Sequence, residues 1–152
     1  LGGMHMMDSL RIEKAFRHFG HDITCEDHVL EAGLGFAAKT DKPNFIGRDA
    51  VLRKRDAGLE RRLVQFRLTD PEPLLYHNEP VIRDGAVVGY LSSGNYGHAL
   101  GGAIGMGYVP CPGETADQVL ASSYEIEVAG ARVTAHASLR PMYDPKSARV
   151  RA

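Results

Sequence analysis

The first part of the chain has hydrophobic residues at helical spacing. Between Met4 and Phe19, apolar side chains recur mostly at intervals of three and four residues, with charged side chains between them. This period predicts an amphipathic α-helix that Gly20 ends. Its apolar positions are Met6, Met7, Leu10, Ile12, Phe16 and Phe19.

The next forty residues predict one strand and a second helix. Residues 31–39 alternate small and apolar side chains, which is typical of a strand, and Gly33 and Gly35 within them indicate close approach of another part of the protein. Residues 47–57 carry three apolar residues among basic ones and end at Gly58. This pattern predicts a helix with a basic face.

From about Glu60 the pattern has a period of two, and no helix longer than one turn is expected. Asp84-Gly85 lies inside an alternating stretch over 81–91, which is a strong hairpin signal, and a second hairpin is predicted around Ala129-Gly130. Further strands are predicted over 64–68 and 103–109, with a loop over 92–102. The fold class is therefore α+β: two helices plus a strand, followed by a small antiparallel, Greek-key-like β-barrel of about six strands. We place the domain boundary near Gly58.

Charge and composition exclude several classes of function. The 152 residues include 18 Lys and Arg against 19 Asp and Glu, a net charge of -1, so a nucleic-acid partner is not expected. The apolar runs are too short to cross a membrane. Cys25 and Cys111 lie far apart with no secretory leader before them, which favours a reducing compartment: the cytoplasm, or the mitochondrial matrix in a eukaryote. Because the first residue is Leu1 and not Met, we interpret the chain as part of a longer one.

Two clusters invite a ligand-binding interpretation that their spacing does not favour. His18, His21, Cys25 and His28 lie within eleven residues, but their order matches no standard zinc site, so we expect a polar surface loop and no metal. The glycines over 101–107 precede a strand instead of a helix, which favours a tightly packed strand over a phosphate loop. No nucleophile motif and no pair of catalytic carboxylates is visible in the sequence.

The segment Asp-Ser-Leu-Arg-Ile-Glu-Lys over 8–14 is more informative. By itself it is a helical turn whose polar side could simply face solvent. Arg11 is of interest because a planar guanidinium can bind a carboxylate or a flat heterocycle through two parallel hydrogen bonds.

Five segments, in the same order along the chain, resemble the C-terminal part of the folate-binding aminomethyltransferase family, which includes the T-protein of the glycine cleavage system. They lie at 8–18, 30–36, 45–48, 61–64 and 88–94. Within that family, residues 8–18, Leu30-Glu-Ala-Gly33 and Pro141-Met-Tyr-Asp-Pro145 are most similar to the folate modules behind a flavin domain in sarcosine and dimethylglycine dehydrogenases.

This resemblance implies that residues 1–58 end the folate-binding domain and that residues 59–152 form the family's C-terminal barrel. It implies tetrahydrofolate as cofactor, with FAD in an upstream domain if the protein is dehydrogenase-like. Arg11 matches the arginine that contacts folate in the family, and Glu13, Gly33 and Gly35 are weaker candidates for lining the site. The family's catalytic aspartate lies upstream of the Ser-Leu-Arg helix, so no catalytic residue is assigned here. Tyr143 is not in register with the tyrosine that T-proteins place near the ligand.

The expected function is that of the C-terminal part of a tetrahydrofolate-dependent one-carbon transferase. Its substrate would be a small N-methyl or aminomethyl amine, and the chain alone would be inactive. Two alternatives remain open. One is a stand-alone glycine cleavage aminomethyltransferase, whose partner would be a lipoyl carrier protein. The other is a barrel that serves only as a structural or docking module without a ligand.

Overall fold

The computed structural model describes residues 2–149 and residue 151. Within that range the chain forms six strands, three α-helices and one 3-10 helix. They are α1 (Met4–Glu13), η1 (Gly35–Ala37), α2 (Arg48–Ala57), β1 (Arg61–Leu68), β2 (Pro80–Arg83), β3 (Ala86–Gly97), β4 (Gly102–Pro110), α3 (Ala116–Ala121), β5 (Tyr124–Val128) and β6 (Ala131–Ser138).

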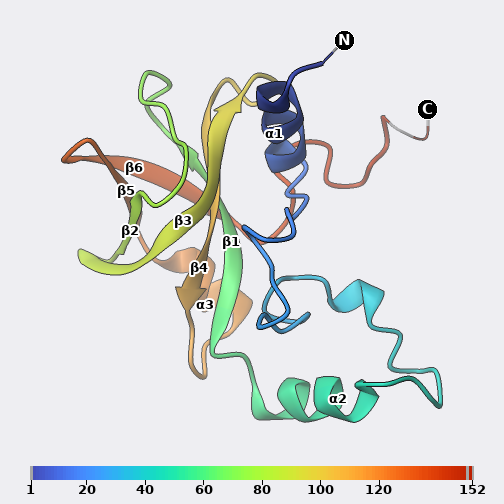
Figure 1. Ribbon diagram of the computed structural model, residues 1–152. Coiled ribbons are helices and arrows are strands. Elements are labelled where there is room, and N and C mark those ends of the chain that lie inside the picture. The colour runs from blue at the N-terminus through green and yellow to red at the C-terminus, as the bar shows by residue number, and fades with distance from the viewer. Residues whose placement is uncertain (1, 150, 152) are drawn as a thin grey trace.

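The strands close into an antiparallel barrel in the order β1-β4-β3-β2-β5-β6 (Figure 1). The consecutive strands β2, β3 and β4 are neighbours and β1 lies beside β4, which is a Greek-key arrangement. Both predicted hairpins are present. Their turns place Asp84 and Gly85, and likewise Ala129 and Gly130, at positive φ, as a two-residue turn between strands requires. The α+β class and the six-stranded barrel are confirmed.

Alternating apolar residues fill the barrel interior. On β1, Val64, Phe66 and Leu68 are wholly buried, and the Phe66 ring packs against Tyr124 of β5 with 5.3 Å between ring centroids. The glycines of β4 allow close approach of β3, because a Cβ atom at Gly107 would lie 2.7 Å from the carbonyl oxygen of Tyr90. The expectation of a tightly packed glycine-rich strand is confirmed.

The first helix is shorter than its period predicts. It ends at Glu13 and not near Phe19, and Ala15 beyond it has a φ of 51°. The predicted apolar face does not cover the barrel: of its six positions only Ile12 is buried, while Phe16 and Phe19 are 59% and 66% exposed. The cause is that α1 packs against the barrel through Ile12 and two polar side chains, Ser9 and Glu13.

Three further expectations are wrong. Residues 31–39 form turns and η1 in place of a strand, because Gly33 turns the chain with a φ of 70°. Residues 92–97, expected in a loop, belong to β3. A six-residue helix, α3, was not anticipated. It begins with a capping box in which Thr115 and Gln118 each bond the other's backbone amide.

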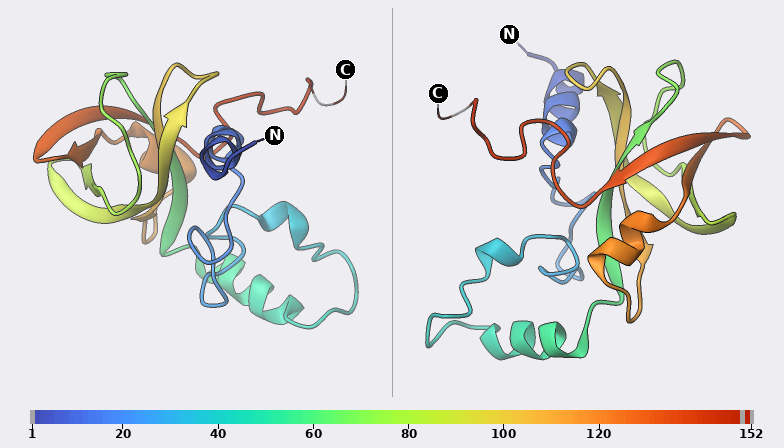
Figure 2. Two further views of the ribbon diagram at one scale, coloured as in Figure 1. Left: turned by 45° about the horizontal axis from the view of Figure 1, so that its top comes forward. Right: turned by 180° about the vertical axis from the view of Figure 1, so that it is seen from behind.

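Helices α1 and α2 lie in different places relative to the barrel. Helix α1 packs on its outer surface beside β3 and β4, whereas α2 extends away from it (Figures 1 and 2). Gly58 lies between α2 and β1 with a φ of 88°, and the domain boundary placed there stays a prediction. In the described part of the chain, no helix is long and apolar enough to span a membrane.

Candidate functional site beside Arg11

Polar contacts fix α1 against the barrel wall. The Ser9 hydroxyl donates to the carbonyl of Tyr96 on β3 at 2.6 Å. Glu13 is buried, and its Oε1 accepts from the amides of Ala99 and Leu100 in the β3–β4 turn at 2.6 and 3.1 Å. These contacts at each end of the helical face place the intervening Arg11 over β3.

The Arg11 guanidinium is held on three sides. Its Nε donates to Asp8 Oδ1 at 2.9 Å, its Nη1 to Asp22 Oδ2 at 2.8 Å and its Nη2 to Ser93 Oγ at 2.9 Å. Nη1 also lies 3.4 Å from the carbonyl oxygen of Phe16. A guanidinium has five N–H donors, so among the described residues a single N–H, on Nη2, has no partner. The Arg11 side chain is 14% exposed.

Asp22 is the group that anchors this arrangement. It is wholly buried; its Oδ2 also accepts from the backbone amide of His18 at 2.8 Å, and its Oδ1 accepts from the Ser92 hydroxyl at 2.6 Å. The carboxylate thus links α1, the loop after it and β3. Because a buried carboxylate is stable only when paired and hydrogen-bonded, Asp22 and Arg11 each keep the other in place.

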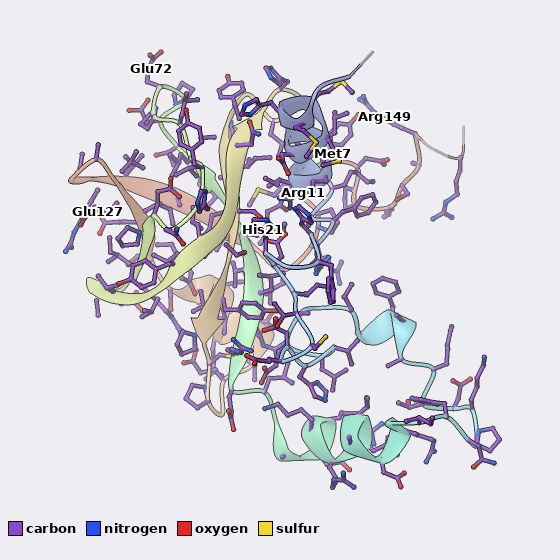
Figure 3. The ribbon with its side chains drawn as sticks, viewed as in Figure 1. Met7, Arg11, His21, Glu72, Glu127 and Arg149 are labelled. Carbon is purple, nitrogen blue, oxygen red and sulfur yellow. The ribbon has the colours of Figure 1, made fainter. Side chains whose placement is uncertain are left out.

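A cavity of about 250 Å³ opens beside this pair, and Figure 3 shows Arg11 and His21 close together where α1 meets the barrel. Histidines are its most frequent lining residue. Among the described residues, no three His, Cys, Asp or Glu side chains are placed to hold a metal ion. The lining residues are Met4, His5, Asp8, Arg11, His18, His21, Tyr76, His77, Ser92, Ser93, Gly94 and Asn95.

The other candidate residues lie elsewhere. Glu13 stabilises the β3–β4 turn and does not reach the cavity. Gly33 has a φ of 70° and packs against Arg17, where a Cβ atom would come within 2.6 Å of the guanidinium, and it lines a separate cavity of about 410 Å³. Gly35 begins η1 and packs against Leu30. The structure therefore brings only Arg11 of the four to this cavity.

Sequence reasoning missed the partners of Arg11. Asp8 is three residues away on the same helix, which is a recognisable spacing. Ser93 is 82 positions away and Asp22 lies beyond the end of the helix, so no local pattern connects them to Arg11. His77 reaches the cavity from the β1–β2 loop, again without a sequence signal.

Comparison with known proteins places the chain in a family. Residues 61–144 match the glycine cleavage T-protein C-terminal barrel domain, and residues 1–42 match the GCVT N-terminal domain. The chain belongs to the glycine cleavage T-protein family. The family resemblance noted in the sequence is confirmed.

Relatives in this family include enzymes that oxidise an amine and aminomethyltransferases. The chain is 42% identical to 4-methylaminobutanoate oxidase (formaldehyde-forming) of Paenarthrobacter nicotinovorans, over 99% of this chain and 18% of that protein. It is 38% identical to human mitochondrial sarcosine dehydrogenase, over 98% of this chain and 17% of that protein. It is 40% identical to the aminomethyltransferase of Halothermothrix orenii, over 74% of this chain and 32% of that protein. The chain thus spans less than a third of the length of each of these relatives.

A solved structure shares the fold. The glycine cleavage system aminomethyltransferase T from Bartonella henselae superposes with a TM-score of 0.74 at 28% sequence identity. The match covers 91% of this chain and 38% of that protein. The barrel and the segment before it are therefore arranged as in a T-protein.

Proposed function

We propose that this chain is the C-terminal part of a tetrahydrofolate-dependent one-carbon transferase. The observation that carries the proposal is the fixed guanidinium of Arg11, which faces a cavity and has one N–H without a partner among the described residues. Folate offers carboxylates and a pterin carbonyl as acceptors for such a donor. When bound, tetrahydrofolate supplies the nitrogens that accept the one-carbon unit.

The geometry changes what Arg11 can do for this ligand. Because Asp8, Asp22, Ser93 and the Phe16 carbonyl already occupy four of its five donors, Arg11 offers one directed hydrogen bond and not two parallel ones. The cavity of about 250 Å³ is smaller than the roughly 300–1,000 Å³ of ordinary ligand pockets. The residues of this chain would therefore form one wall of the folate site and orient part of the ligand, while the catalytic carboxylate comes from outside this chain.

Within the family, we place the chain at the folate end of a flavin-dependent enzyme that oxidises an N-methyl amine. The support is that 4-methylaminobutanoate oxidase and sarcosine dehydrogenase are 42% and 38% identical over 99% and 98% of this chain, against 35% over 93% for the aminomethyltransferase of Synechococcus elongatus. Such an enzyme would pass the oxidised methyl carbon to tetrahydrofolate, giving methylenetetrahydrofolate. A stand-alone aminomethyltransferase with a lipoyl carrier partner is the second candidate, favoured by the fold match to the Bartonella protein.

Calorimetric titration with tetrahydrofolate tests the role of Arg11. We expect the chain to bind weakly, and Arg11→Ala to weaken binding about 10- to 100-fold, as expected for loss of a charge-assisted hydrogen bond. Since Arg11→Ala leaves Asp22 unpaired, a second variant, Arg11→Ala with Asp22→Asn, removes both charges. Arg132→Ala on β6, whose side chain is 48% exposed, is the matched control and should bind like the parent chain.

Two results would contradict the proposal. Unchanged affinity in both Arg11 variants, each shown by circular dichroism to be folded, would remove Arg11 from the site and favour a barrel without a ligand. Aminomethyl transfer by the 152-residue chain alone would show that the catalytic groups lie within it.

A further inference from the structure

Four histidines from three separate segments line the cavity beside Arg11. His5 lies on α1, His18 and His21 on the loop after it, and His77 on the loop between β1 and β2. The rings of His18 and His21 stack with centroids 4.6 Å apart and planes 33° apart. His18 bonds Asp22 through its backbone amide, and across residues 2–149 no hydrogen bond or ion pair engages any of the four imidazole rings. The rings are therefore available to a ligand.

The other charged groups around these rings do not make the cavity positive. Asp8 and Asp22 both bond Arg11, so two carboxylates outnumber one guanidinium. On the β1–β2 loop, the Glu79 carboxylate accepts from the backbone amide of Tyr76 at 2.8 Å and adds a further negative charge near the cavity. With neutral imidazoles, these carboxylates weaken the attraction that Arg11 exerts on an anion in the cavity. Protonation of the histidines adds positive charge and strengthens that attraction.

Protonation and anion binding would reinforce each other here. Two imidazolium rings 4.6 Å apart repel, and an anion between or beside them relieves that repulsion. If a ligand binds more tightly to the protonated rings, its binding is accompanied by uptake of protons on the histidines. The affinity of that ligand then rises as the pH falls.

We propose that His5, His18, His21 and His77 form a carboxylate-binding site whose occupation is coupled to proton uptake. This inference rests on the proposed function in one respect, since it assumes that the cavity receives a carboxylate ligand. That carboxylate could belong to the glutamate part of folate or to an amino-acid substrate such as sarcosine. The shared chemistry is the carboxylate, and the two sources are separated experimentally.

Calorimetry on the chain at pH 6 and pH 8 tests this coupling, with tetrahydrofolate, 4-aminobenzoylglutamate and sarcosine as probes. Repeating each titration in two buffers of different ionisation enthalpy gives the number of protons taken up. We expect the carboxylate that occupies the site to bind roughly tenfold or more tightly at pH 6, with uptake of about one proton. Aminobenzoylglutamate binding identifies the folate tail as the source, and sarcosine binding identifies the substrate.

A double variant separates the histidines from other causes of pH dependence. His18→Gln with His21→Gln should lose most of the gain in affinity that the parent chain shows between pH 8 and pH 6. His136→Gln on β6, away from the cavity, is the matched control and should keep the full gain. The two removed rings make no hydrogen bond within the described residues, so the double variant should fold, and circular dichroism checks that it does.

The outcomes distinguish this inference from the proposed function. Tetrahydrofolate binding with equal affinity and no proton uptake at both pH values would overturn the inference and leave the proposed function intact. Sarcosine binding with proton uptake, in the absence of tetrahydrofolate binding, would support the inference and overturn the proposed function. A pH dependence that persists in the double histidine variant, or no binding of any probe, would also overturn the inference.

Discussion

At the residue scale, Glu31 connects three parts of the molecule. It is 5% exposed, and its carboxylate receives Lys54 of α2 at 2.7 Å and Arg61 of β1 at 3.2 Å. Burial pushes the pKa of Glu31 upward, but the hydrogen bonds from Lys54 and Arg61 outweigh burial and hold the pKa below its ordinary value. Glu31 therefore stabilises the folded chain in its ionised form.

The lowered pKa predicts a pH-dependent cost for Glu31→Gln. Since the pKa is lower in the folded than in the unfolded chain, the stabilisation is complete above the ordinary value of 4.5 and is lost as the pH falls through the folded value. We expect Glu31→Gln to lower the free energy of unfolding by about 1–2 kcal/mol at pH 7, because both partners reach partly into solvent. Below about pH 4.5 the difference should shrink. Urea unfolding across this range measures it, and Glu60→Gln, 84% exposed, should show no such trend.

Individual residues of the site were only partly predictable. Arg11 could be chosen as a candidate because the segment around it resembles the folate-binding aminomethyltransferase family, and its role as a folate contact stays a prediction. The chemistry of Arg11 could not be predicted, since that depends on Asp22 and Ser93, whose contacts come from folding and not from spacing along the chain. Glu13 stabilises a turn and Gly33 makes room for Arg17, while a place for either of them in the ligand site stays a prediction.

At the element scale, α1 reverses the usual relation between pattern and burial. Its polar residues Ser9 and Glu13 are buried against β3 and β4, while Met4 and Leu10 are 67% and 53% exposed. Periodicity predicts that a helix exists, and this was correct. It cannot tell which side faces the barrel when the hydrogen bonds of Ser9 and Glu13 hold the helix in place together with one apolar side chain, Ile12.

Gln65 on β1 connects the end of α1 to the C-terminal segment. Its side chain is buried; Nε2 donates to the carbonyl of Ile12 at 2.6 Å and Oε1 accepts from the amide of Met142 at 2.9 Å. We expect Gln65→Leu to cost about 1–3 kcal/mol, because it leaves both backbone groups without a partner. Gln65→Glu keeps the acceptor for the Met142 amide but places a carboxylate oxygen against the Ile12 carbonyl oxygen. We therefore expect Gln65→Glu to be no more stable than Gln65→Leu.

Hydrogen exchange distinguishes this role from a general loss of packing. In both Gln65 variants, amides near the end of α1 and over 139–149 should exchange faster while β3 and β4 remain protected. Uniformly faster exchange across the barrel would show that Gln65 acts on the barrel as a whole.

The pairing of β3 with β4 depends on glycine at specific positions. A Cβ atom at Gly107 would lie 2.7 Å from the Tyr90 carbonyl oxygen and 3.3 Å from Leu91 Cα, both backbone atoms that cannot move independently. We expect Gly107→Ala to destabilise the chain by about 1–3 kcal/mol, measured by thermal or urea unfolding. Gly102→Ala in the same strand meets nothing closer than 3.5 Å and should have little effect. Equal costs at the two positions would contradict this explanation.

At the scale of the whole molecule, the sequence was most informative about the barrel. Its hairpins depend on local turn residues and alternation, which a single sequence displays directly. The closure of the ring and the position of α1 depend on contacts between distant segments, such as β1 with β6 and Ser9 with Tyr96, so they had to be seen in the structure. The family resemblance predicted a C-terminal barrel but none of these contacts between distant segments.

The molecule should open first in the segment that carries α2. This helix has ten residues and none of them is buried, whereas an isolated helix shorter than about 12–15 residues is only marginally stable in water. Its Lys54 pairs with Glu31, which in turn pairs with Arg61 of β1. We therefore expect amides over 48–57 to exchange far faster than those of β1, β3 and β4, and trypsin to cleave first within 39–57.

One lysine variant and one arginine variant test whether the ion pair of Lys54 with Glu31 limits the opening of α2. Lys54→Ala should speed exchange in α2 further without changing the barrel, because it frees the helix from Glu31. Arg55→Ala is the matched control: Arg55 is 57% exposed and pairs only with its neighbour Asp56 in the described chain, so its loss should leave the exchange unchanged. If α2 and the barrel exchanged at the same rate, the chain would unfold as one cooperative unit, and a boundary near Gly58 would have no energetic counterpart.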